Sequence, residues 1–147
     1  MPKERKPMRR SDCPLSVALD MFGDRWSLLI IRDLMFKDRH EFRDFLGAEE
    51  SIATNVLADR LQRLEGCGII AKTPHPVDAR KTEYRLTKRG LDLAPVLIEM
   101  MIWAAMHETT AAPRSVVRRM IRDRDAFIAE LRTLHGHSPR AKSSRKP

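Results

Sequence analysis

Residues 51–90 read SIATNVLADRLQRLEGCGIIAKTPHPVDARKTEYRLTKRG, and the spacing of the hydrophobic residues changes within this stretch. Leucines recur at helical intervals between 57 and 64, so we expect a helix from Ser51 to about residue 65, closed by glycines at 66 and 68. After it the period falls to two, which predicts strands at 69–73 and 82–86. The proline-marked, polar segment 74–81 between the strands predicts the tip of a hairpin.

Helices are expected on both sides of this stretch. Three precede it, at 14–22, 25–36 and 40–46, and two follow it, from 87 to about 107 and over 113–135. A helical trio, a further helix and then a basic hairpin is the order of a winged helix-turn-helix. The predicted fold class is therefore mainly α with a small β-hairpin, a winged helix-turn-helix whose terminal helices form a dimer interface.

Several motifs, in the same order along the chain, resemble those of the HxlR-type transcriptional regulators. They are CPL at 13–15, FGDRWSLLI at 22–30, LQRLE at 61–65, GII at 68–70, EYRLT at 83–87, and LAP at 93–95 with Trp103. The resemblance covers about residues 13–107. The sequence departs from the family pattern at Ala53, where a serine is usual, and at 78–81, where further prolines are usual. The resemblance implies a homodimeric DNA-binding protein.

The charge of the chain is concentrated at its ends. The formal net charge of the 147 residues is +8, and the segments 1–12 and 136–147 hold +7 of it. We expect these segments to be a basic flexible N-terminal arm and a basic disordered tail. Between them the sequence predicts a winged-helix domain at 13–110 and a C-terminal helix at 111–135 for dimerisation or packing. Composition alone is therefore weak evidence for a nucleic-acid partner.

The helix at about 51–65 is the expected recognition helix. If its leucines face the core, its polar side faces outward. A recognition helix enters the major groove N-terminus first, where asparagine pairs with adenine and threonine reaches a thymine methyl. An amphipathic helix whose polar face contacts only solvent has the same pattern. The position of this helix directly before a hairpin favours the interpretation that it contacts DNA. The candidate DNA-contacting residues are Ser51, Thr54, Asn55, Ala58, Asp59, Gln62 and Arg63.

The hairpin at about 69–86 is the expected wing. From Lys72 to Arg89 there are six basic residues and two acidic ones. Basic side chains on a projecting ribbon neutralise phosphates, and one at the tip can reach the minor groove. A hairpin kept soluble by its charge is the alternative. The candidate wing contacts are Lys72, His75, Arg80 and Lys81.

The helix after the hairpin is apolar on most of its circumference, since only Asp92 and Glu99 are charged between residues 91 and 106. Such a helix needs a second surface to cover it, either the core of its own chain or a second copy. We expect a dimer interface that includes Leu97, Met101 and Trp103, as the family resemblance also implies. A two-fold dimer binds an operator with two half-sites.

The chain has two cysteines, and Cys13 lies at the start of the first predicted helix, near Arg9 and Arg10. Both the helix dipole and the cations favour its thiolate. Some HxlR-type proteins sense oxidants or electrophiles through a cysteine at the matching place, so Cys13 is a candidate redox sensor. Packing at a subunit contact is the alternative. Cys67, between two glycines, is expected to be structural.

Other classes of protein have no support in the sequence. No run of 18 uncharged apolar residues predicts a membrane span, and no apolar core follows the basic N-terminus to mark a secretory signal. The glycines form no phosphate-binding loop. We therefore predict a cytoplasmic, non-enzymatic homodimer that binds double-stranded DNA and contains no metal or cofactor. A small molecule or an oxidant is the expected effector, and the sequence does not specify which one. The alternatives are a winged-helix protein-interaction module and a thiol-based sensor acting through Cys13.

Overall fold

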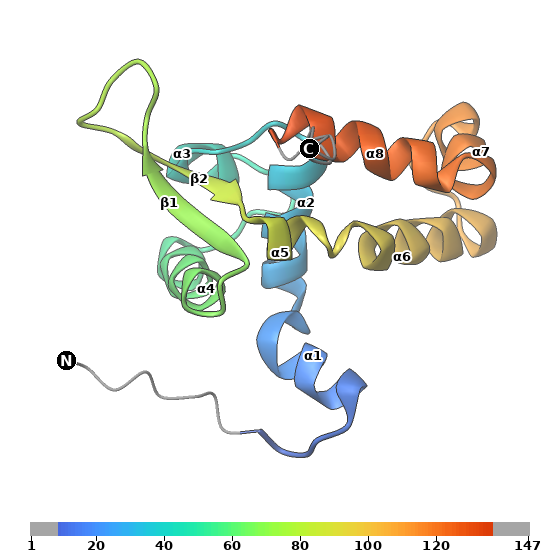
Figure 1. The fold of residues 1–147 in the computed structure, drawn as a ribbon, viewed down its shortest axis with the longest axis horizontal. Helices are drawn as coiled ribbons and strands as arrows, with labels where there is room; N and C mark the ends of the chain where they lie inside the picture. The colour runs from blue at the N-terminus through green and yellow to red at the C-terminus, as the bar shows by residue number, and fades with distance from the viewer. Residues whose placement is uncertain (1–8, 137–147) are drawn as a thin grey trace, which may run out of the picture. The chain divides into compact units, whose positions relative to one another are not determined.

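The structure, a computed structural model, describes residues 9–136 (Figure 1). The expected basic arm and tail therefore lie outside the described residues, except for 9–12 and 136. The chain forms two compact units that divide between Arg85 and Leu86. The second unit contains both the end of the expected domain, up to residue 110, and the expected C-terminal helix at 111–135.

The first unit contains four helices followed by a two-stranded sheet. Its elements are α1 (Pro14–Phe22), α2 (Arg25–Phe36), α3 (Phe42–Leu46), α4 (Thr54–Gly66), β1 (Ile70–Pro74) and β2 (Thr82–Leu86), the last ending at the boundary between the units. The winged helix-turn-helix order predicted from the sequence is confirmed.

Helix α2 is the central helix of this unit. Ile31 and Leu34 are completely buried, and α2 packs against α4, whose Leu57 is also completely buried. The Asp24 carboxylate caps α2 by accepting a hydrogen bond from the Ser27 N–H at 3.1 Å. Gly23 links α1 to α2, and a Cβ there would lie 2.6 Å from the Leu19 backbone, so only glycine fits.

Two helices begin later than the sequence predicted. Helix α4 begins at Thr54 and not at Ser51, because Ser51 has a φ of 58° and lies in a turn before the helix. A left-handed residue cannot continue a right-handed helix. Helix α3 begins at Phe42, with Glu41 and Asp44 forming a reciprocal capping box, and not at residue 40.

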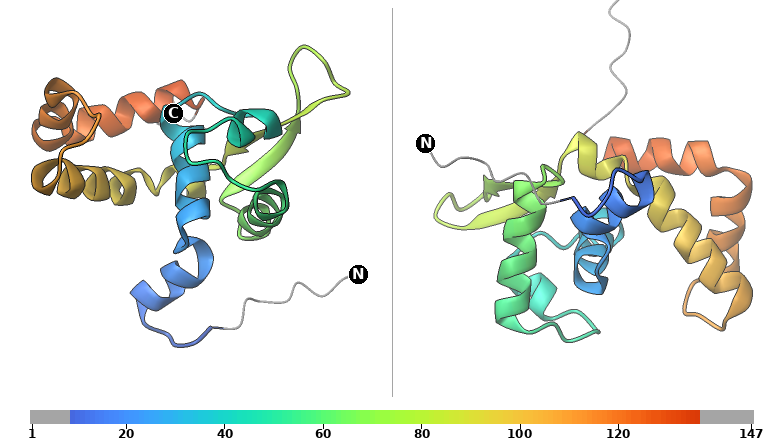
Figure 2. Two further views of the ribbon diagram at one scale, coloured as in Figure 1. Left: turned by 180° about the vertical axis from the view of Figure 1, so that it is seen from behind. Right: turned by 90° about the horizontal axis from the view of Figure 1, so that it is seen from below.

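The hairpin extends away from the helices of its unit (Figures 1 and 2). Its strands pair with each other, and β1 is shifted by one residue from the predicted 69–73. The Tyr84 N–H donates to the His40 carbonyl at 2.8 Å, so the segment before α3 pairs with the outer side of β2. This hydrogen bond ties the base of the hairpin to the helices.

Apart from Leu86, the end of β2, the elements in the described part of the second unit are helices. Its elements are α5 (Lys88–Leu91), α6 (Ala94–His107), α7 (Arg114–Arg122) and α8 (Arg124–Leu134). Each of the two long helices expected here is broken in two. The first is interrupted at residues 92–93, and Pro95 lies in the first turn of α6, where a missing N–H costs no hydrogen bond. The second breaks at Asp123, whose φ and ψ of −119° and 41° are not helical.

The run Lys88–His107 is long and apolar enough to cross a membrane, judged by length and composition only. This run contains Asp92 and Glu99, so it is not an uninterrupted stretch of uncharged apolar residues. Core helices of soluble proteins have the same property, and this run is interrupted between α5 and α6. The finding is weak evidence for a membrane span.

Candidate nucleic-acid interface

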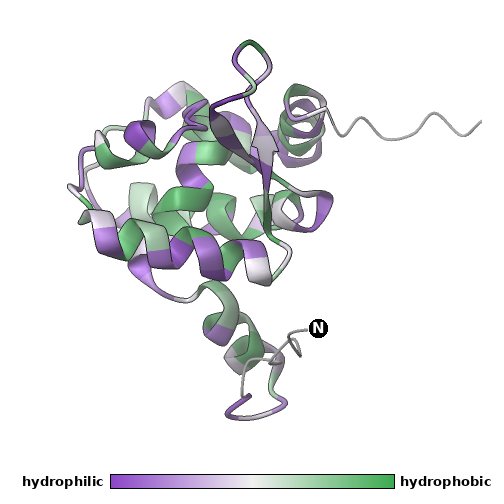
Figure 3. Ribbon diagram, turned by 90° about the vertical axis from the view of Figure 1, so that its left-hand side faces the viewer, coloured by the Kyte–Doolittle hydropathy of each residue, from purple (hydrophilic) through white to green (hydrophobic). Residues whose placement is uncertain are grey.

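Helix α4 exposes a continuous polar face. Leu57, Leu61 and Leu64 are buried on one side of the helix, and hydrophilic and hydrophobic residues alternate along it (Figure 3). The predicted contact residues on this helix are all exposed: Thr54, Asn55, Ala58, Asp59, Gln62 and Arg63. Ser51 is exposed too, but it belongs to the turn before the helix and not to its face. Asp59 pairs with the neighbouring Arg60.

Both ends of α4 have defined geometry. Ala53 occupies the N-cap position with extended backbone, and it supplies no side-chain hydrogen bond to the first turn. At the other end, the Ile69 N–H donates to the Leu64 carbonyl and the Gly68 N–H donates to the Glu65 carbonyl, both at 3.0 Å. This is a Schellman motif, and the φ of 74° at Gly68 explains why glycine is found there. The motif turns the chain directly into β1.

An ion pair connects α4 to the start of α2. The Arg60 Nε lies 2.8 Å from Asp24 Oδ2, the carboxylate that also caps α2. Burial alone would raise the pKa of Asp24, but hydrogen bonds from Ser27 and Arg60 outweigh it, and the pKa is lowered. The carboxylate is thus held in its charged form, and the ion pair ties α4 to the start of α2.

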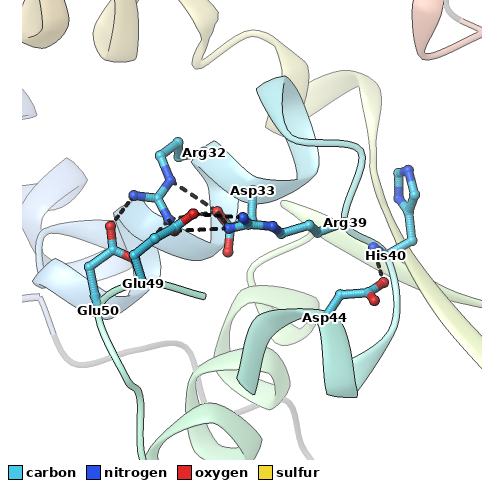
Figure 4. Close-up of polar contacts among 7 residues, drawn as sticks. All are labelled: Arg32, Asp33, Arg39, His40, Asp44, Glu49 and Glu50. Carbon is cyan, nitrogen blue, oxygen red and sulfur yellow. Dashed lines mark hydrogen bonds and ion pairs between the residues drawn. The ribbon is translucent and has the colours of Figure 1, made fainter. Parts of the chain in front are cut away.

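The turn before α4 is held by a network of charged residues that the sequence analysis missed (Figure 4). Asp33, buried in α2, accepts hydrogen bonds on Oδ1 from Arg32 at 2.7 Å and from Arg39 at 3.1 Å. Arg39 also pairs with Glu49 at 3.0 Å, and Arg32 pairs with Glu50. The Arg39 hydrogen bond lowers the pKa of the Glu49 carboxyl to about 2. One signal was present in the sequence: Asp33 is an acidic residue within the apolar run of α2.

The wing presents fewer free charges than its composition suggests. Lys72 and Lys81 are exposed, and within the described part of the chain neither has an ion pair. Arg80 Nε lies 3.1 Å from Asp78, and Arg85 pairs with Glu83 at 2.6 Å, so two of the six positive charges are compensated within the hairpin.

His75 organises the tip of the wing. Its Nδ1 accepts hydrogen bonds from the N–H groups of Val77 and Asp78, at 3.1 and 3.3 Å. Its Nε2 lies 3.4 Å from Glu41 Oε1 at the start of α3. The accepted hydrogen bonds place the ring proton on Nε2, so both nitrogens have partners within the protein. His75, a predicted DNA contact, therefore has both ring nitrogens engaged within the protein.

A hollow of about 560 Å³ separates α4 from the hairpin. Ala58 and Gln62 of α4 face it from one side, and Lys72 and Tyr84 of the hairpin face it from the other. Tyr84 is fixed there by an edge-to-face contact with Phe45, at 6.3 Å between ring centroids. Two predicted sites, the recognition helix and the wing, thus border one concave surface.

The residues expected at the dimer interface lie in different environments. Leu97 is only 5% exposed within the single chain, and Met101 is half-buried. Trp103 is 64% exposed and stacks obliquely on His107, with 4.7 Å between ring centroids. The exposed apolar stripe of α6 consists of Val96, Met100, Trp103 and Met106.

Cys13 is exposed and occupies the N-cap position of α1, at the helix start where the sequence placed it. The backbone N–H groups of Ser16 and Leu15 lower the pKa of the Cys13 thiol below its ordinary value. Arg9, a cation close to Cys13 in the sequence, lies 4.0 Å from the Asp12 carboxylate. Cys67 is half-buried and caps the end of α4.

The first unit combines a supported helix with an exposed polar face, a turn fixed by ion pairs and a hairpin wing beside it. These features define a winged helix-turn-helix protein. Residues 21–112 match the HxlR-like helix-turn-helix family over more than half of the chain, and the protein belongs to that family.

The sequence is 38% identical over 88 residues to an uncharacterised HTH-type transcriptional regulator of Synechocystis. That match covers 60% of this chain and 64% of the relative, so the chain spans less than two thirds of the relative's length.

Two solved structures resemble the fold. The redox regulator HypR in its oxidised form matches with 27% identity and a TM-score of 0.59, over 67% of this chain and 100% of that chain. The reduced form of the transcriptional regulator YodB from Bacillus subtilis matches with 33% identity and a TM-score of 0.54, over 66% of this chain and 95% of that chain. YodB has also been solved after diamide treatment and bound to quinone.

Proposed function

We propose that this protein is a cytoplasmic, homodimeric transcriptional regulator that binds double-stranded DNA. Helix α4 enters the major groove, and the β1–β2 wing contacts the backbone or the minor groove. The main observation that supports this proposal is the exposed polar face of α4 beside the projecting hairpin. The proposal includes no catalytic step, and the relatives described above are regulators.

The roles of the two elements differ. Asn55 lies in the first turn of α4, is exposed, and carries an amide that pairs bidentately with adenine. Lys81 lies on the wing, where its unpaired charge neutralises a phosphate. Asn55 therefore reads sequence, whereas Lys81 positions the protein on any duplex.

Fluorescence anisotropy with the selected operator and with random duplexes tests this division. Asn55→Ala should lose about 1–3 kcal/mol on the operator and little on random DNA. Lys81→Ala should weaken both similarly and reduce the slope of log affinity against log salt by about one. Equal losses for Asn55→Ala on all sequences would remove it from the base contacts. Absence of salt-sensitive duplex binding in the wild type would favour the alternative, a protein-interaction module.

The exposed stripe of α6 supports the homodimer. Val96, Met100, Trp103 and Met106 are each at least 39% exposed and follow one another at helical spacing. A second copy that covers this stripe removes apolar surface from water. Two α4 helices then meet half-sites about one turn of DNA apart.

The oligomeric state is tested by sedimentation. Met100→Asp places a charge in the stripe without disturbing the buried core, and it should convert a dimer to a folded monomer. Val77→Asp is the matched control, because Val77 is 90% exposed at the tip of the wing. A wild-type monomer at high micromolar concentration would contradict the proposal.

A second function is favoured by the position of Cys13. We propose that it senses oxidants or electrophiles, because it is exposed and its thiol pKa is lowered by the N–H groups of Ser16 and Leu15. YodB, solved in diamide-treated and quinone-bound forms, is a related protein. The test is the alkylation rate of Cys13 against pH with Cys67→Ser, together with operator affinity before and after mild oxidation. An ordinary thiol pKa with unchanged affinity would leave Cys13 as a packing residue.

A further inference from the structure

A cavity of about 590 Å³ lies between the C-terminal end of α6, the following loop and α7. Ala105 of α6 and Val117 and Ile121 of α7 give it apolar walls. Its volume is within the range of about 300–1,000 Å³ that is typical of small-molecule sites. Half of its lining residues come from α7, which lies beyond residue 112, where the match to the family ends. All of the lining residues belong to the second unit, whereas α4 and most of the hairpin belong to the first.

The charges around this cavity are unbalanced. Arg114, Arg118 and Arg122 line it, and their spacing of four residues places them on one side of α7. Among residues 9–136, none of the three has a carboxylate within 4.0 Å, and Glu108 is the single acidic residue in the lining. Three other arginines of this unit do have partners: Arg119 pairs with Glu130, Arg124 with Glu99, and Arg132 with Asp92.

The combination of free guanidinium groups and apolar walls specifies the chemistry of a ligand. A guanidinium group binds a carboxylate through two parallel hydrogen bonds, and it does so more strongly where water is partly excluded. The side chains of Val117 and Ile121 offer apolar surface to the rest of the same molecule. Thr109 adds a hydroxyl group at the rim.

We propose that this cavity binds a small organic anion, a carboxylate carried on an aromatic or aliphatic body. The carboxylate contacts Arg118 together with Arg114 or Arg122, and the apolar body lies against Val117 and Ile121. Inorganic anions lack the apolar body, and uncharged aromatic molecules lack the group that the arginines recognise. The cavity therefore discriminates against both.

Isothermal titration calorimetry of the full chain with 2-naphthoate tests the proposal. We expect saturable binding of 2-naphthoate, and binding of the uncharged 2-naphthamide that is weaker by about tenfold or more. The double variant Arg118→Gln with Arg122→Gln should bind 2-naphthoate about tenfold or more weakly, and it should no longer distinguish the acid from the amide. Both substituted side chains are at the surface, so the helices remain folded.

Arg119→Gln is the matched control. It removes one positive charge from the same helix, but Arg119 faces Glu130 and lies 5.4 Å from the centroid of the Phe127 ring, outside the cavity. This variant should bind 2-naphthoate with the affinity of the wild type. An equal loss in the control and the double variant, equal binding of acid and amide, or no saturable binding at millimolar concentration would overturn the proposal. Inorganic phosphate that binds as tightly as 2-naphthoate would refute the role of the apolar walls.

Discussion

Replacement of Asp33 by alanine tests whether the charged network positions the turn before α4. The Asp33 side chain is 3% exposed, and its Oδ1 accepts from Arg32 Nε at 2.9 Å, Arg32 Nη2 at 2.7 Å and Arg39 Nη1 at 3.1 Å. Removal of one partner from a buried ion pair costs about 3–5 kcal/mol. Both arginines keep a carboxylate, on Glu50 and Glu49, and are about one fifth exposed, so we expect a smaller loss, about 2–4 kcal/mol.

Urea denaturation followed by circular dichroism measures this loss. Asp78→Ala is the control, because Asp78 pairs with Arg80, which is 91% exposed, and surface pairs contribute about 0–1 kcal/mol. Asp33→Ala should also weaken operator binding, since Glu49 and Glu50 lie in the turn that leads into α4. If Asp33→Ala were no less stable than Asp78→Ala, the network would not hold this turn.

Three further predictions concern α4 and the turn before it. Ala53→Ser should raise the free energy of unfolding by about 0.5–2 kcal/mol, because the N-cap geometry is present and the capping oxygen is missing; an unchanged urea midpoint would contradict this. Leu57→Ala should lower the free energy of unfolding by about 2–5 kcal/mol, since Leu57 is completely buried between α4 and its neighbours. The same urea titration measures this loss. The pKa of Glu49 is lowered from 4.5 to about 2 by the Arg39 hydrogen bond, so its contribution to stability is complete above about pH 4.5 and is lost as the pH falls towards 2. Glu49→Gln should therefore lose less stability than the wild type between pH 5 and pH 3; equal losses would refute the assignment.

The elements of the DNA-binding unit were predictable because their signals are local. The leucines of α4 recur at helical spacing, Asp24 caps α2, and Gly68 takes the left-handed conformation that ends α4. Each of these choices depends on residues a few positions apart. The boundaries were less predictable, since the start of α4 depends on the left-handed backbone of Ser51, a residue type that favours no such conformation.

The pairing of charged side chains was not predictable from spacing. Asp59 pairs with its neighbour Arg60, and Arg60 also reaches Asp24, which is 36 residues away in the sequence. The His75 ring accepts a hydrogen bond from the backbone of its own hairpin and lies 3.4 Å from Glu41, and neither partner is evident from the sequence. Long side chains can select among many partners, and only the folded backbone brings particular ones within hydrogen-bond distance.

By itself, the sequence determined the order of the elements, the polar face of α4, the basic hairpin and the position of Cys13 at a helix start. These follow from periodicity, capping and turn chemistry, which act over a few residues. Only the tertiary structure decided that Asp33 holds the turn before α4, that Leu97 is buried while Trp103 is exposed, and that three arginines of α7 surround a cavity. Burial and ion pairing depend on which segments the fold brings together, and residues distant in sequence carry no local signal of that proximity.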